Sequence, residues 1–150
     1  MSPVAPVRLR GHHLLCLLGY RGMGYSKAFI RRMDRVHERL RQDTGAMVRL
    51  CEGPDELCRA CPPSERSHCV SARVAQRDAR VLARIDVPVG ACLAWGDLSR
   101  RLAERVVPGD IARWCAGCPW EPLGLCAGGL ERLRAGGGLL QQPSGSGGEV

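Results

Sequence analysis

Six of the nine cysteines in this 150-residue chain fall into two triplets with the same spacing. Both triplets read Cys-x-x-Cys-Pro-x6-Cys: the first triplet is Cys58, Cys61 and Cys69, and the second triplet is Cys115, Cys118 and Cys126. Two cysteines separated by two residues can place both sulfur atoms on one metal, while the amide hydrogens of the intervening turn stabilise the thiolate charge. The repeated spacing therefore predicts two thiolate nests, each supplying three ligands of a metal site.

Three thiolates leave one ligand position to be filled in each nest. The donors that the chain offers are Cys16, His12, His13, Cys51 and Cys92. Three arrangements remain open: Cys51 and Cys92 complete the two triplets, or Cys16 and a neighbouring histidine do so, or the two Cys-x-x-Cys pairs share a single metal. We favour Cys16 with a histidine, because Cys51 and Cys92 are readily explained as small apolar residues.

The spacing alone does not choose between zinc and an iron–sulfur cluster. Structural zinc accepts four cysteines, or three cysteines and a histidine, and iron–sulfur clusters take four thiolates. A disulfide framework is disfavoured, because the number of cysteines is odd and the N-terminus does not resemble an export signal. Nor does any apolar stretch approach the length of a membrane span. We therefore expect a cytoplasmic protein without a membrane partner, whose cysteines bind metal.

The histidines and Cys16 lie in an apolar segment, residues 10–20, that predicts a short and largely buried helix ending at Gly19. On such a helix, His12 and Cys16 are i, i+4 neighbours, and His13 and Cys16 are i, i+3 neighbours, so either histidine can face the thiol. The competing interpretation makes Cys16 a core residue beside two helix-start histidines. A nucleophilic Cys16 activated by a histidine is disfavoured, because the surrounding leucines imply burial rather than a substrate cleft.

The remaining pattern predicts helices that lead into and out of the two triplets. The predicted elements are a helix at Lys27–Asp43 capped by Ser26, a strand at Met47–Cys51, a helical turn at Cys58 capped by Asp55, and helices at Val70–Ile85, from Asp97 or Ser99 to Val106, from Asp110 to Trp114 and at Leu130–Leu133. Asp78 falls on the apolar side of its helix, so we expect it to be half exposed or paired with an arginine.

These elements predict a mainly α, small and irregular metal-stapled domain, with short helices around the two nests and little or no β structure. We assign residues 1–135 to a single cysteine-rich helical domain and residues 136–150 to a disordered Gly/Ser-rich tail. The net charge is +7, and Lys27 is the only lysine. The arginines are scattered without interleaved aromatic residues, so nucleic-acid binding is permitted but weakly supported.

The string Arg10–Cys16 (RGHHLLC), continuing through Gly22–Ser26, resembles the opening of a family of small bacterial and archaeal proteins of unknown function that are described as iron–sulfur-binding. The resemblance extends over about residues 8–133. The motif residues that carry over are His12, His13, Cys16, Cys58, Cys61, Cys69, Cys115, Cys118 and Cys126. The resemblance implies an iron–sulfur cluster, with a 4Fe–4S cluster favoured over other types and over zinc.

The expected function is therefore that of an iron–sulfur protein with an electron-transfer, redox-sensing or accessory role and an unidentified redox or protein partner. The alternative is a zinc-stapled structural or nucleic-acid-binding module. The sequence contains no triad, phosphate-binding loop or carboxylate pair, so a stand-alone enzyme is not expected.

Overall fold

The computed structural model describes residues 5–22, 26–60, 70–115 and 124–139. Its elements are β1 (Val7–Leu9), α1 (Gly11–Gly19), α2 (Lys27–Gln42), β2 (Met47–Leu50), the 3-10 turn η1 (Cys58–Ala60), α4 (Ala72–Ile85), β3 (Cys92–Ala94), α5 (Trp95–Arg105), α6 (Pro108–Trp114) and α7 (Leu125–Arg134). The prediction of a mainly helical protein is confirmed. None of the helices in the described ranges is both long and apolar enough to cross a membrane.

A small three-stranded sheet corrects the expectation of little or no β structure. The strand order is β1-β2-β3, with β1 parallel to β2 and β2 antiparallel to β3. The strand β2 agrees with the predicted strand at Met47–Cys51. Both β1 and β3 have only three residues, and an alternating pattern needs a longer run than that to be recognised.

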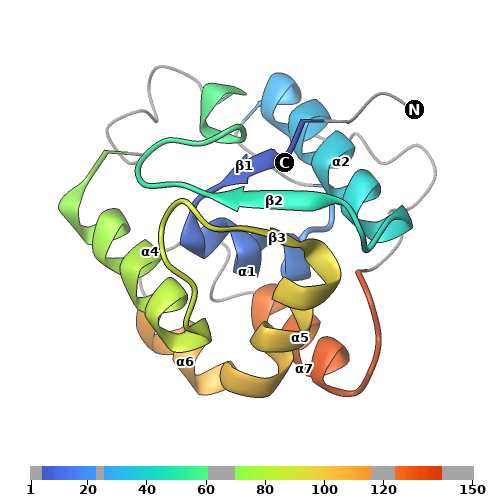
Figure 1. Ribbon diagram of the computed structural model, residues 1–150, viewed down its shortest axis with the longest axis vertical. Helices are drawn as coiled ribbons and strands as arrows, with labels where there is room; N and C mark the ends of the chain where they lie inside the picture. The colour runs from blue at the N-terminus through green and yellow to red at the C-terminus, as the bar shows by residue number, and fades with distance from the viewer. Residues whose placement is uncertain (1–4, 23–25, 61–69, 116–123, 140–150) are drawn as a thin grey trace.

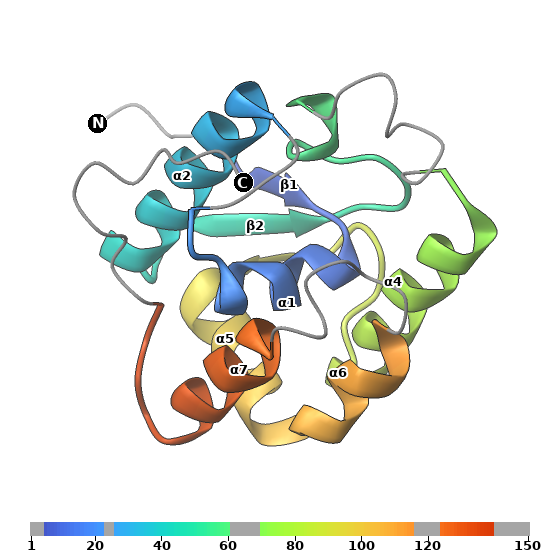
Figure 2. The ribbon, with the colours of Figure 1, turned by 180° about the vertical axis from the view of Figure 1, so that it is seen from behind.

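Helix α1 occupies the centre of the molecule. It lies between the sheet and the helices α5 and α7, and it also contacts α4, while α2 and η1 lie on the opposite side of the sheet (Figures 1 and 2). All of its residues except Cys16 are buried. The continuous leucines of this segment predict such a helix, because a helix enclosed on all sides needs no polar face.

Glycines let α1 approach its neighbours closely. A Cβ atom at Gly11 would lie 2.5 Å from the carbonyl oxygen of Asp78 in α4, and one at Gly129 in α7 would lie 2.0 Å from the carbonyl oxygen of Leu18. Any larger residue at either position would push the helix backbones apart. These contacts fix the depth of α1 in the core.

The amphipathic helices follow the sequence pattern closely. Ser26 caps α2 by accepting the amide hydrogen of Phe29, and Ser71 caps α4 by accepting that of Val74, so α4 starts two residues later than predicted. Helix α7 starts before the predicted Leu130. In the predicted tail, Leu139 is buried in the core, whereas residues 140–150 lie outside the described ranges, so their disorder stays a prediction.

Candidate metal site

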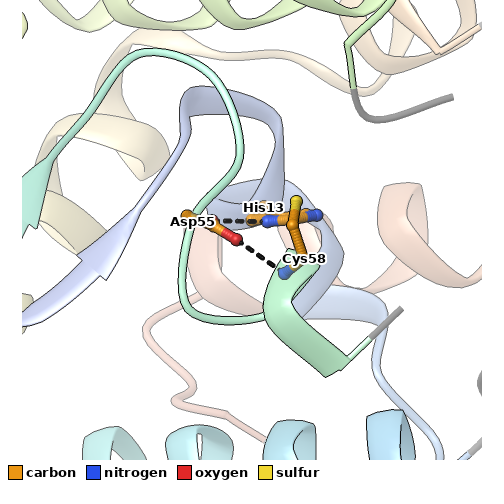
Figure 3. Close-up of side chains that lie close together, drawn as sticks. All are labelled: His13, Asp55 and Cys58. Atoms are coloured by element: carbon orange, nitrogen blue, oxygen red, sulfur yellow. Dashed lines mark hydrogen bonds and ion pairs between the residues drawn. The ribbon is translucent and has the colours of Figure 1, made fainter. Parts of the chain in front are cut away.

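Three side chains that are distant in the sequence meet at one buried point. His13 comes from α1, Asp55 from the loop between β2 and η1, and Cys58 from the start of η1 (Figure 3). A ring nitrogen of His13, a carboxylate oxygen of Asp55 and the Sγ of Cys58 all lie within 4.8 Å of one another. This His13–Asp55–Cys58 group could hold a metal ion, and it is the only such group found within the described residues.

The parallel pairing of β1 and β2 brings these residues together. Because the two strands run in the same direction, the segments that follow them leave the same edge of the sheet. The pairing continues past the strands, where the amide of Cys51 donates to Leu9 and the amide of Glu56 donates to Arg8. As a result, the start of α1 and the loop that carries Asp55 lie side by side.

Asp55 positions the other two members of the group. Its Oδ1 accepts the amide hydrogens of Leu57 at 2.9 Å and Cys58 at 3.1 Å, which confirms the predicted cap of the helical turn. Its Oδ2 accepts the amide hydrogen of Arg10 at 2.7 Å and lies 2.6 Å from Nδ1 of His13. Burial alone would raise the pKa of Asp55, but His13 and these hydrogen bonds hold it well below its usual range.

His13 is consequently fixed with one ring nitrogen open. Its Nδ1 lies 2.6 Å from Oδ2 of the ionised Asp55 and donates to it, so the tautomer that can bind a metal has its lone pair on Nε2. The Nε2 atom has no hydrogen-bond partner among the residues that the structure describes. A histidine held in this way by a carboxylate is a common metal ligand, since the carboxylate sets the ring orientation and makes the open nitrogen more basic.

Cys58 shares its surroundings with a buried cation. The Nη1 atom of Arg10 lies 3.6 Å from Sγ of Cys58, and the Nε atom of Arg10 donates to Oδ2 of Asp78 at 2.7 Å. The side chain of Arg10 is only 1% exposed. A guanidinium at this distance stabilises negative charge on sulfur, which is the form that binds metal.

His12 forms a second histidine–carboxylate pair beside the first one. Oδ1 of Asp78 accepts the amide hydrogen of His12 at 2.9 Å and lies 2.6 Å from its Nδ1. The rings of His12 and His13 have centroids 4.4 Å apart. Burial and the adjacent His13 lower the pKa of His12 to about 4, so this ring is neutral at pH 7. The expected arginine partner of Asp78 is confirmed as Arg10, but Asp78 is buried rather than half exposed.

The structure brings two of the predicted ligands together, and the other predicted ligands that it describes do not belong to the same group. His13 and Cys58 belong to the metal-binding group, whereas His12, Cys16, Cys115 and Cys126 do not. Cys16 is half buried on α1, Cys115 is buried at the end of α6, and Cys126 is half buried in the first turn of α7. Cys61, Cys69 and Cys118 lie outside the described residues, so the completion of either nest stays a prediction.

The two cysteines that were left out of the predicted ligand set lie outside the group. Burial and the nearby carboxylate of Asp55 raise the pKa of Cys51 to about 11, so Cys51 keeps its proton at neutral pH. Cys92 is half buried in β3. Among the described cysteines, no disulfide joins one to another.

The sequence predicts Asp55 as the cap of the turn at Cys58, but it does not reveal Asp55 as the partner of His13 or Asp78 as the partner of His12. Asp55 follows His13 by 42 residues and Asp78 follows His12 by 66, and nothing in the local pattern links the members of either pair. Arg10 belongs to the opening string, and the sequence pattern predicts no role for it. One signal was available: Asp78 occupies the apolar side of α4, where an acidic residue needs a buried partner.

One comparison with known proteins gives a match. A family model described as "Protein of unknown function (DUF1284)" matches residues 24–124, a stretch that contains Asp55, Cys58 and Asp78 but not the opening string. Neither the curated proteins nor the solved structures contain a match to this chain. The family description names no cofactor, so the iron–sulfur expectation gains no support from it.

Proposed function

Since this chain belongs to the DUF1284 family, whose function is unknown, its role has to be argued from its site, and we propose that it is a metal-binding protein. His13 supplies a nitrogen ligand and Cys58 a sulfur ligand, while Asp55 and Arg10 hold them in place. The observation that carries this proposal is an imidazole held by a carboxylate beside a buried thiol, with a ring nitrogen of His13 and the Sγ of Cys58 within 4.8 Å of each other.

The burial of these polar groups supports a ligand other than solvent. His13 is 8% exposed, Cys58 is 7% exposed and Asp55 is 2% exposed. Burying polar groups costs free energy unless each one finds a partner. Both oxygens of Asp55 already accept two hydrogen bonds each, which makes Asp55 a positioning residue rather than a direct ligand. The open Nε2 of His13 and the sulfur of Cys58, which lies beside the guanidinium of Arg10, are the two atoms that would bind the metal.

Zinc fits this ligand set best. One histidine nitrogen with three thiolates is a common structural zinc site, and Cys61 and Cys69 of the first triplet would complete it. Such a site would hold the loop after β2 against α1, and its thiolates would stay reduced in the cytoplasm. The zinc ion would thereby link two segments that are distant in the sequence.

An iron–sulfur cluster is the second candidate, because two triplets of identical spacing occur in one chain. All-thiolate coordination at these triplets would give a redox or electron-transfer protein with an as yet unidentified partner. Under this alternative, His13 would orient the site without binding iron, and the buried Arg10 would offset the negative charge of the cluster.

Metal analysis and a visible spectrum of protein purified without oxygen test both candidates. Zinc gives a colourless protein with bound zinc, and a cluster gives a brown protein with broad absorbance near ~400 nm that bleaches on reduction. We expect Cys58→Ser to lose the metal and Cys92→Ser, a cysteine outside the group, to keep it. A wild-type protein without stoichiometric metal, or a Cys58→Ser variant that retains it, would contradict the proposal.

A further inference from the structure

A recess lined mainly by arginines lies between α4 and α6, away from the metal-binding group. It has a volume of about 150 Å³ and is lined by Arg73, Gln76, Arg77, Arg80, Arg113 and Trp114. Arg73, Arg77 and Arg80 follow one another at intervals of four and three residues, so they lie on one face of α4. Among the described residues, no acidic one belongs to the lining.

The arginines of α4 in this recess have no carboxylate partner within the described residues. Asp78, the acidic residue of α4, binds Arg10 and His12 instead. Asp110 of α6 pairs with Arg113 and with Arg84, which lies outside the recess. The recess therefore holds a surplus of positive charge that no carboxylate in the described ranges neutralises.

Arg77 gives the recess a buried cationic floor. It is only 5% exposed, and its Nε donates to the carbonyl oxygen of Trp114 at 2.7 Å. Its two Nη atoms have no hydrogen-bond partner in the described part of the chain. A guanidinium carries five donors, so the four on the Nη atoms of Arg77 are available to solvent or to an acceptor that enters the recess.

The wall opposite α4 is also fixed in place. The guanidinium of Arg84 lies 5.2 Å from the ring centre of Trp114 and donates to Asp110 at 2.7 Å. Asp110 in turn accepts the amide hydrogen of Val107 at the start of α6 at 3.0 Å. These contacts hold Trp114 and α6 in position, so the recess is formed before a ligand arrives.

We propose that this recess binds a phosphoryl group, carried by a small molecule or by inorganic phosphate itself. Phosphate oxygens match the forked donors of guanidinium groups in charge and geometry. The Nη atoms of Arg77 bind the oxygens deepest in the recess, and Arg73 and Arg80 close over them. The proposal is independent of the metal, because none of the lining residues belongs to the metal-binding group.

Isothermal titration of the full chain with inorganic phosphate and with adenosine monophosphate, at matched ionic strength in sodium chloride, tests the site. We expect saturable one-to-one binding and at least a tenfold loss of affinity in the double variant Arg73→Gln/Arg80→Gln. The matched control is Arg100→Gln/Arg105→Gln, which removes the same charge from α5 and should retain wild-type affinity. Arg77→Lys keeps the positive charge but loses the two Nη groups that can bind two phosphate oxygens at once, so it should also weaken binding.

The outcomes distinguish specific binding in the recess from general electrostatic attraction to a positively charged surface. Tighter binding of adenosine monophosphate than of phosphate identifies a nucleotide-like ligand, and equal binding identifies the phosphate ion; both support the site. Absence of saturable binding would overturn the proposal, as would an equal loss of affinity in the two double variants. Binding of polynucleotide alone would also overturn it, because that result describes a charged surface rather than a site for one phosphoryl group.

Discussion

At the scale of single residues, α1 carries two buried imidazoles whose Nδ1 atoms are both held by carboxylates from other elements. Asp55 holds His13 and Asp78 holds His12, and the buried Arg10 bonds to both of these aspartates. Two carboxylates face only one guanidinium in this cluster, which also contains the sulfur of Cys58. A bound divalent cation would offset the charge of the carboxylates, which is a second reason to expect a metal here.

The role of Asp55 can be tested by Asp55→Asn, which keeps the side-chain size but removes the charge that fixes His13. We expect the affinity for zinc to fall by about 10–100-fold, because partners that orient a histidine ligand have effects of this size. Competition with a chromophoric chelator measures the affinity. Asp97→Asn, an exposed residue of α5, serves as the control. An unchanged affinity in folded Asp55→Asn would show that Asp55 does not act through His13.

His37 of α2 is the other residue-scale anomaly in the core. It is 1% exposed, and neither ring nitrogen has a hydrogen-bond partner among the residues that the structure covers. Burial lowers its pKa to about 4, although the nearby Glu38 acts in the opposite direction. The folded protein therefore keeps His37 neutral at a pH where the unfolded chain, with an ordinary pKa of 6.5, takes up a proton.

This difference predicts that acid destabilises the fold. As the pH falls from about 6.5 to about 4, the unfolded state gains a proton at His37 and the folded state does not, so His37 lowers the free energy of unfolding by up to about 3 kcal/mol. In His37→Leu we expect a shallower decrease over this pH range. Urea denaturation at pH 7, 5.5 and 4.5 gives both curves. Parallel curves for the two proteins would show that His37 does not titrate as its burial implies.

At the scale of elements, the packing of α1 against α7 depends on glycines that the sequence pattern gave little reason to single out. Gly128 and Gly129 are adjacent in α7, yet only Gly129 faces α1. A Cβ at Gly129 would lie 2.0 Å from the carbonyl oxygen of Leu18, whereas one at Gly128 would have no atom of another described segment within 4 Å. The close packing therefore requires glycine at position 129, whereas position 128 has room for a larger side chain.

Alanine substitutions should separate these two requirements. Gly128→Ala should raise the free energy of unfolding by about 0.5–1 kcal/mol, because alanine favours a helix more than glycine does. Gly129→Ala should lower it by about 1–3 kcal/mol, because the methyl group forces α7 away from α1. Urea denaturation of both variants beside the wild type provides the measurement. If both substitutions raised the free energy of unfolding, the conclusion that α1 and α7 are in close contact at Gly129 would be wrong.

At the scale of the whole molecule, the sequence predicted what depends on local pattern. The periodicity and caps of α2 and α4, and the burial of α1, follow from residues close together in the chain. The short strands β1 and β3 and the parallel pairing of β1 with β2 do not, because no local signal specifies a partner 41 residues away. The site shows the same division: His13 and Cys58 were predicted as ligands, but their partners became visible only once distant segments met.

The proposed metal also acts at this scale, because it would join α1 to the loop and turn that follow β2. Removing it with a chelator should lower the midpoint of thermal unfolding by about 5–10 °C, the shift expected when free metal at 100 times its dissociation constant contributes about 2.7 kcal/mol. Scanning calorimetry with metal analysis of each sample measures both quantities. Cys92→Ser should behave as the wild type, and Cys58→Ser should start at the lower midpoint and respond to neither chelator nor added metal. A metal-mediated link between α1 and η1 that exists only in the folded state must stabilise that state. If wild-type protein that has lost its metal unfolded at an unchanged temperature, the ion would not link these two segments.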